Sequence, residues 1–249
     1  MHAGKSGLIV LALTAVVAAQ TPEPPLSDSR LTVHTLVRED VFAGFMANDM
    51  NRFARAERNI DALMAQRPDQ QANLLAWKGA TKLYRAVLAR EAGNDADFMR
   101  TVHEARELWE QAAKLPTGND GVPAIVGGSL ATFADRLPQD MRATAWSMSY
   151  DNYALLWKLQ APAIEQRQLP VHFSGEVLAG LTQAAQRTGR SDEAAQYIDK
   201  MLTVLKDTPY ESTAKRWKAD PASASASNLT CKSCHEERRL APLMSALNK

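Results

Sequence analysis

Apolar residues recur at spacings of three and four along most of the chain, and prolines divide this pattern into units. Pro68, Pro116, Pro162 and Pro209 are separated by 48, 46 and 47 residues. The segment before each proline places its apolar residues on one helical stripe. The clearest stripes are Phe53, Ala56, Ile60, Leu63 and Met64; Val102, Ala105, Leu108, Trp109 and Ala112; and Ala194, Ile198, Met201, Leu202 and Leu205. The pattern predicts four helical hairpins.

An aspartate precedes each proline by about twenty residues and indicates where the second helix of each hairpin begins. These residues are Asp49, Asp95, Asp140 and Asp192. Aspartate caps helices because its side chain accepts hydrogen bonds from free backbone amides. The first helices are predicted over residues 37–47, 71–91, 122–136 and 172–188. Their small residues should allow close approach of neighbouring helices, and these are Gly79, Ala80, Gly127, Gly128, Ala179 and Gly180.

The fourth unit resembles a tetratricopeptide repeat in the order of its large and small residues. The matching positions are Leu178, Leu181, Ala185, Gly189, Ala194 and Ile198. The resemblance implies antiparallel helix pairs stacked as a solenoid over residues 31–219, with an inner surface that binds a peptide or partner protein. The family period is about 34 residues, so the longer period here implies longer helices. The expected fold is all-α, and an irregular helical bundle is the alternative.

Residues 1–19 have the pattern of a secretory signal peptide. Lys5 precedes an apolar run over residues 8–17, and small residues at 17–19 suit cleavage before Gln20. A spanning helix needs about 20 apolar residues, so no transmembrane segment is expected after cleavage, and an uncleaved anchor is the alternative. Export to the periplasm or the medium follows. Residues 20–30 contain three closely spaced prolines and are expected to form an extended leader.

Beyond the fourth unit, residues 210–218 suit one more short helix, with Trp217 packed on the last repeat. Residues 220–228 are rich in serine and alanine and have the composition of a linker. Without residues 1–19, which contain Lys5, 28 basic residues balance 28 acidic ones. This balance gives no basis for binding nucleic acid or an anionic membrane.

Both cysteines lie in Cys231-Lys232-Ser233-Cys234-His235, within the C-terminal segment 229–249. This is the C-x-x-C-H pattern of c-type haem attachment. Two thiols three residues apart can each add to one vinyl group of a porphyrin, and the adjacent imidazole of His235 can bind the iron. We therefore expect one covalent haem c. A disulfide or a zinc site is the alternative, although zinc needs four ligands and the other imidazoles are distant in sequence.

The motif and the residues after it resemble cytochrome c′, whose C-K-x-C-H motif also lies near the C-terminus before acidic residues and an arginine. The resemblance implies thioether bonds at Cys231 and Cys234, His235 as proximal ligand and Arg239 near the haem edge. It covers about nine residues. The Ser/Ala segment before the motif and Pro242 after it depart from that family, so its gas-binding behaviour is not carried over.

The sixth iron ligand stays open from sequence, and it separates electron carriers from haems that bind small molecules. The candidates are His172, His103, Met46, Met50, Met148 and Met244. The sequence lacks a phosphate-binding glycine loop, a G-x-S-x-G motif and a zinc-protease motif. The sequence favours a mono-haem electron-transfer or accessory protein that docks a protein partner. A repeat scaffold with unused or disulfide-bonded cysteines and an open-coordination haem enzyme are the alternatives.

Overall fold

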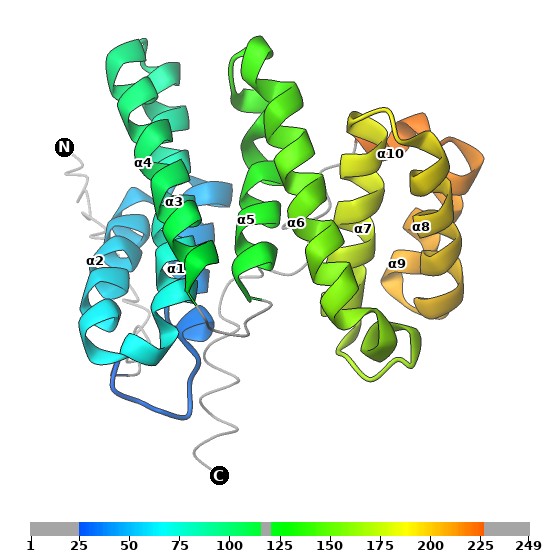
Figure 1. The fold of residues 1–249 in the computed structure, drawn as a ribbon, viewed down its shortest axis with the longest axis horizontal. Helices are drawn as coiled ribbons and strands as arrows, with labels where there is room; N and C mark the ends of the chain where they lie inside the picture. The colour runs from blue at the N-terminus through cyan, green and yellow to red at the C-terminus, as the bar shows by residue number, and fades with distance from the viewer. Residues whose placement is uncertain (1–24, 116–120, 227–249) are drawn as a thin grey trace, which may run out of the picture.

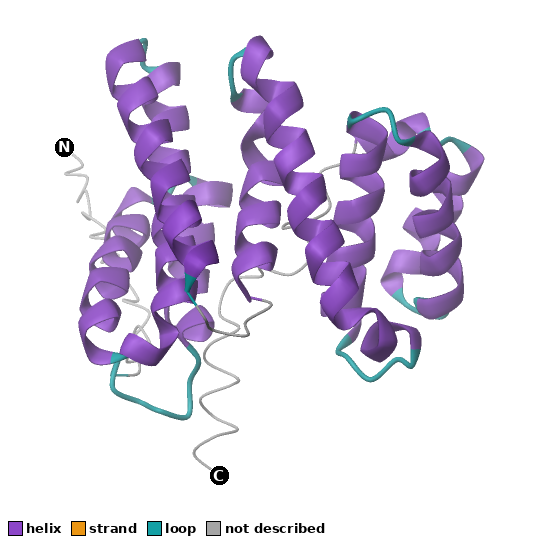
Figure 2. Ribbon diagram, viewed as in Figure 1, coloured by secondary structure: helices purple, strands orange, loops and turns teal. Residues whose placement is uncertain are grey.

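The computed structural model describes residues 25–115 and 121–226, and over these residues the chain is all-α. Ten α-helices and two short 3-10 segments account for the secondary structure of these two ranges, which contain no strand (Figures 1 and 2). The expected fold class is therefore confirmed.

Eight of the helices form four successive antiparallel hairpins, as the sequence predicted. The pairs are α1 (Val33–Ala47) with α2 (Met50–Gln66), α3 (Gln71–Glu91) with α4 (Asp95–Lys114), α5 (Gly121–Phe133) with α6 (Gln139–Glu165), and α7 (Val171–Arg187) with α8 (Ser191–Val204). Two shorter helices follow, α9 (Pro209–Ala219) and α10 (Ala222–Ala226). The hairpins lie side by side, with α3 against α5 and α6 against α7 (Figure 1).

The aspartates mark the helix starts, but only one of them is a cap. The carboxylate of Asp49 accepts a hydrogen bond from the backbone N–H of Arg52 at 3.1 Å. At α4 the cap is Asn94, and Asp95 is the first helical residue. Asp140 and Asp192 lie in the first turns of α6 and α8. The capping prediction is therefore wrong for three positions, where the acidic group suits the positive end of the helix dipole instead.

Pro162 does not end α6, contrary to the expectation that each proline closes a unit. The helix continues to Glu165, and the N–H of Gln166 donates to the Pro162 carbonyl at 3.1 Å. Inside a helix, proline lacks the N–H that would bond the carbonyl four residues earlier, and its ring crowds that carbonyl. One missing bond in the last turn is compatible with a helix held by packing on both sides.

Part of the expected linker is helical. Residues 222–226 form α10, which packs against α7 and α9, and the side chain of Ala224 is fully buried. Gln183 of α7 donates from Nε2 to the carbonyl of Ala224 at 3.4 Å. Alanine is the best helix former, so composition alone could not separate linker from helix here. The expected burial of Trp217 on the last hairpin is confirmed.

Residues 26–31 are held against the first hairpin rather than forming a free extended leader. The guanidinium of Arg67 donates to three backbone carbonyls, those of Leu26 and Asp28 at 2.7 Å and that of Leu31 at 2.6 Å. Leu31 is buried. The leader prediction is therefore wrong for residues 26–30, because one arginine binds their backbone carbonyls, whereas the burial of Leu31 agrees with a helical domain that begins at residue 31.

Replacing Arg67 by methionine should release this stretch without unfolding the array. Each lost bond to a charged donor costs about 1.5–3 kcal/mol, so amide exchange at Leu31 should rise at least about tenfold. Hydrogen exchange followed by mass spectrometry measures this change. Arg58→Met, at an exposed position of α2, the helix that ends just before Arg67, is the control. Equal protection of Leu31 in both variants would contradict the anchoring role.

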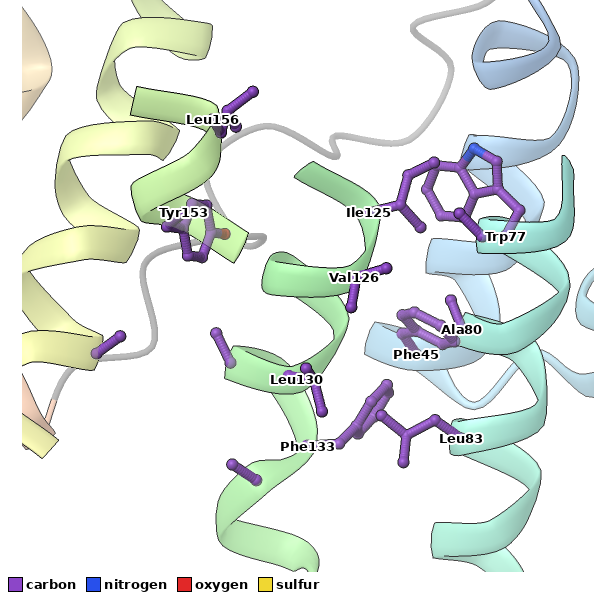
Figure 3. Close-up of a cluster of buried hydrophobic side chains, with 14 of the residues drawn as sticks. Phe45, Trp77, Ala80, Leu83, Ile125, Val126, Leu130, Phe133, Tyr153 and Leu156 are labelled. Carbon is purple, nitrogen blue, oxygen red and sulfur yellow. The ribbon is translucent and has the colours of Figure 1, made fainter. Parts of the chain in front are cut away.

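Aromatic side chains join the first three hairpins. Phe133 of α5 meets Phe45 of α1 edge to face, with ring centroids 4.7 Å apart, and stacks on Tyr84 of α3 at 5.3 Å. Tyr84 in turn contacts Phe53 of α2 at 5.1 Å. Figure 3 shows Phe45 and Phe133 between the helices. Phe53 and Phe133 are completely buried. We call Phe45, Phe53, Tyr84 and Phe133 the aromatic cluster.

Four glycines, Gly44, Gly79, Gly175 and Gly180, lie directly against aromatic rings of other helices. Two of them, Gly79 and Gly180, belong to the small residues predicted to allow close approach of neighbouring helices, and for these two the prediction is confirmed. A Cβ atom on Gly79 would lie 2.4 Å from Nε1 of Trp109, and one on Gly180 would lie 2.4 Å from Cζ of Tyr153. A glycine at these positions therefore leaves the space that the ring occupies. Tyr153 comes from α6, so the contact at Gly180 joins the third hairpin to the fourth.

Gly180→Ala should destabilise the protein by about 1–3 kcal/mol, because the added methyl group overlaps a fully buried ring. Gly128→Ala is a milder comparison on α5, since its Cβ would lie 3.3 Å from the Tyr153 hydroxyl, which needs to move only a few tenths of an ångström, and alanine favours helix by about 0.5–1 kcal/mol. Urea denaturation followed by circular dichroism compares the two variants. Equal losses would show that the close contact at Gly180 is unimportant.

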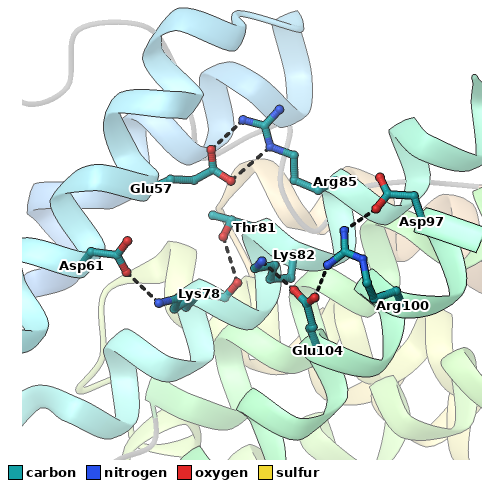
Figure 4. A network of polar contacts seen from close by, with 9 residues as sticks. All are labelled: Glu57, Asp61, Lys78, Thr81, Lys82, Arg85, Asp97, Arg100 and Glu104. Atoms are coloured by element: carbon teal, nitrogen blue, oxygen red, sulfur yellow. Dashed lines mark hydrogen bonds and ion pairs between the residues drawn. The ribbon is translucent and has the colours of Figure 1, made fainter.

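A surface network of charges connects α2, α3 and α4 (Figure 4). Arg85 pairs with Glu57 at 2.6 Å, Lys78 with Asp61 at 2.7 Å and Lys82 with Glu104 at 2.6 Å. The groups are partly exposed, so each pair stabilises by at most about 1 kcal/mol. The network aligns neighbouring helices and shows no arrangement suited to catalysis.

Candidate functional site

The predicted haem-attachment residues Cys231, Cys234 and His235 lie outside the described residues. The same holds for the signal-peptide residues 1–19, for Arg239 and for Met244. The site is therefore built here from the residues that lead to the motif and from the candidate second ligands within 25–115 and 121–226.

The chain enters the motif from a fixed position on the array. Helix α10 is held against α7 and α9, and Cys231 follows its last residue, Ala226, by five positions. Five residues span at most about 18 Å. Helix α10 is therefore the described element from which the chain continues towards the motif.

The three imidazoles of the described residues differ in what their ring nitrogens do. His34 of α1 accepts a hydrogen bond at Nδ1 from the indole N–H of Trp77 at 3.0 Å. His103 of α4 is 72% exposed, and its Nε2 lies 3.1 Å from a carboxylate oxygen of Glu107. His172 lies in the first turn of α7, where its ring is 4.1 Å from that of Phe173.

The candidate methionines have structural surroundings. Met50 and Met148 are partly buried and pack against the hydrophobic core. Met46, near the end of α1, is 37% exposed. A thioether that fills an irregular space in a core is a common use of methionine, so the structure supplies no arrangement that favours these three as iron ligands.

Glu176 of α7 is a functional candidate that sequence reasoning missed. It follows His172 by four residues and therefore lies on the same side of the helix. Its Oε1 atom lies beside Gly128 of α5, where the Tyr153 hydroxyl also lies. Burial raises the pKa of Glu176 to about 7, and the positive charge of Arg38 on α1 acts in the opposite direction. Charges on α1 and α7 thus interact although their hairpins are first and fourth in sequence.

A carboxyl group that titrates near neutral pH can hold or release a proton, or accept a cationic partner. The sequence offered one signal for it, a single acidic residue among the apolar and small residues of the helix predicted over 172–188. That signal does not reveal that the Glu176 side chain is buried, because its burial depends on how α5 and α1 pack near α7.

The residues of ranges 25–115 and 121–226 contain no cluster of three or more histidine, cysteine or acidic side chains suited to a metal ion. Within the same ranges, every helix is too short or too polar to cross a bilayer. Comparisons of the chain with protein-family models, curated proteins and solved structures found no match. The tetratricopeptide and cytochrome c′ resemblances therefore stay predictions.

Proposed function

We propose that the chain is an exported mono-haem c-type cytochrome that transfers electrons or serves as a haem-bearing accessory protein. The observation that carries the proposal is the Cys231-Lys232-Ser233-Cys234-His235 motif, which holds both cysteines of the chain. The export pattern at residues 1–19 supports it, because haem c is attached outside the cytoplasm. The proposed location is the periplasm or the medium.

The donor set fits haem c. Cys231 and Cys234 supply two thiols at the spacing of the porphyrin vinyl groups, and His235 supplies the proximal imidazole. When bound, the haem supplies one-electron redox chemistry, tuned by its axial ligands and its burial. The protein residues attach it, orient it and restrict where it can meet a partner.

The helical array supports a docking role. In the proposal the hairpins stack as a tetratricopeptide-like solenoid and bind a redox partner or a peptide. Exposed large apolar residues on neighbouring elements favour a protein contact, and these are Leu155 and Leu159 on α6 and Val171 and Phe173 on α7. A plain interaction scaffold, whose cysteines form a disulfide, is the second candidate, favoured by the same array.

The test is to express the chain in a host that matures c-type cytochromes and to measure the mass and the pyridine haemochrome spectrum. The expected result is one haem per chain, attached by two thioether bonds. Replacing Cys231 and Cys234 together by alanine should abolish attachment, whereas Ser233→Ala, between them, should retain it. Bare polypeptide in a host that loads another c-type cytochrome would overturn the proposal, and loss of two hydrogens would favour the scaffold with a disulfide.

A further inference from the structure

Helix α6 has one side that the other described helices leave exposed. The helix packs against α5 and α7, and it lies beside both in Figure 1. Residues three, four and seven positions from Leu155 share one side of the helix with it. The exposed residues on this side, which we call the α6 stripe, are Asp151, Leu155, Lys158, Leu159 and Pro162.

Exposed apolar side chains are concentrated at the junction of α6 and α7. Six large apolar side chains of the described ranges are exposed, and four of them belong to these two helices. On α6 they are Leu155 and Leu159, at 48% and 56% exposure, and on α7 they are Val171 and Phe173. Such a concentration indicates a protein contact, whereas single exposed apolar residues need no explanation.

The two charged residues of the α6 stripe lie on either side of Leu155. Asp151 precedes it by four residues and Lys158 follows it by three, so the opposite charges are about 10 Å apart along the helix. At that separation they do not pair with each other. Neither side chain forms a hydrogen bond or an ion pair with another residue of the two described ranges. The stripe therefore presents an acidic and a basic group with an apolar residue between them.

This arrangement is complementary to itself. In a contact with two-fold symmetry, each pair of residues that meets across the interface occurs twice. When two α6 helices run antiparallel with the axis at Leu155, Asp151 of each copy lies opposite the turn that carries Lys158 of the other. Leu155 meets its own counterpart at the axis, and Leu159 lies opposite residues 148–152 of the second copy.

We propose that the α6 stripe is the interface of a homodimer in which two α6 helices pack antiparallel about a two-fold axis at Leu155. The occupant of the exposed apolar surface is then a second copy of this chain. The contact uses no haem and no residue of the C-x-x-C-H motif, so it goes beyond the proposed function and can be tested separately from it.

The first experiment measures the mass of the full chain by sedimentation equilibrium, with a thiol reductant present so that no disulfide joins two copies. A contact centred on one helix is small for a specific interface, so a dissociation constant on the order of 1–100 µM is expected. Leu155→Glu should weaken association at least about a hundredfold, because two carboxylates would meet at the axis. Met99→Glu, at an exposed position of α4, is the control and should dimerise like the wild type.

Charge reversal tests the antiparallel register. Asp151→Lys and Lys158→Asp should each weaken self-association about tenfold, because like charges then lie opposite each other twice in the dimer. An equal mixture of the two variants should associate as tightly as the wild type, because each lysine of one variant then meets an aspartate of the other. Circular dichroism checks that the helices are retained in every variant.

A wild type that stays monomeric well above the expected dissociation constant overturns the dimer and leaves the α6 stripe to a different protein. A dimer that survives Leu155→Glu, or a mixture of the charge variants that associates no better than either alone, overturns the antiparallel contact. Covalent haem, measured by intact mass on the same samples, decides the proposed function whatever the oligomeric state.

Discussion

Phe133→Ala is expected to lower the free energy of unfolding by about 3–5 kcal/mol, the usual cost of removing a large side chain from a core. Phe133 is completely buried at the end of α5. Its ring meets Phe45 and Tyr84, which belong to the first and second hairpins. Alanine would leave a cavity where three hairpins meet, so the loss includes the contacts between units as well as the buried area.

Urea denaturation measured by circular dichroism and by tryptophan fluorescence tests this expectation. Because a helical array depends on contacts between neighbouring units, the two probes should no longer give the same midpoint in the variant. Met99→Ala is the control, since Met99 is 58% exposed on α4 and should change stability by less than about 0.5 kcal/mol. Similar losses in both variants would contradict the role given to the aromatic cluster.

Glu176→Gln is expected to change how stability depends on pH. Burial raises the pKa of Glu176 from 4.5 in the unfolded chain to about 7 in the folded protein. Between these values the folded state binds more protons than the unfolded state, so stability falls as pH rises and is lowest above the folded pKa. The wild type is therefore most stable, with respect to this group, below pH 4.5.

Glutamine removes this titration. The free energy of unfolding of the variant should exceed that of the wild type by about 2 kcal/mol near pH 8. A pKa shift corresponds to about 1.4 kcal/mol per unit. The expected difference is smaller than the full shift would give, because Glu176 keeps partial solvent access. Near pH 4 the two proteins should differ little. Glu110→Gln, on an exposed position of α4, should retain the wild-type pH dependence. A variant with the same pH dependence as the wild type would show that Glu176 is solvated.

Sequence periodicity predicted the helices because each apolar stripe is a local property. The helix predicted over 71–91 agrees with α3 at both ends, and an aspartate lies at the start of the second helix of every hairpin. Pro116 lies outside the described residues. The sequence pattern did not predict features that depend on the packing of neighbouring helices or on individual caps. Asn94 rather than Asp95 caps α4, Pro162 lies inside α6, and α10 forms where composition indicated a linker.

The candidate site likewise has a part that the sequence predicts and a part that depends on how distant helices pack. The spacing of Cys231, Cys234 and His235 is a local chemical signal and is legible in the sequence alone. Arg38 is 138 positions before Glu176, and no periodicity connects them. Likewise, the ring of Tyr153 could be assigned to the notch at Gly180 only after α6 and α7 were placed together.

The contact between Tyr153 and Gly180 limits how hairpins can be added to or removed from this chain. Arrays with a uniform interface can gain or lose a unit, because each junction accepts any neighbour. Here the junctions differ, with aromatic rings between the first three hairpins and a ring in a glycine notch before the fourth. Deleting the third hairpin, for example, would remove the Tyr153 ring from the notch at Gly180 and the Phe133 ring from Phe45 and Tyr84, so the hairpins of this chain are not interchangeable.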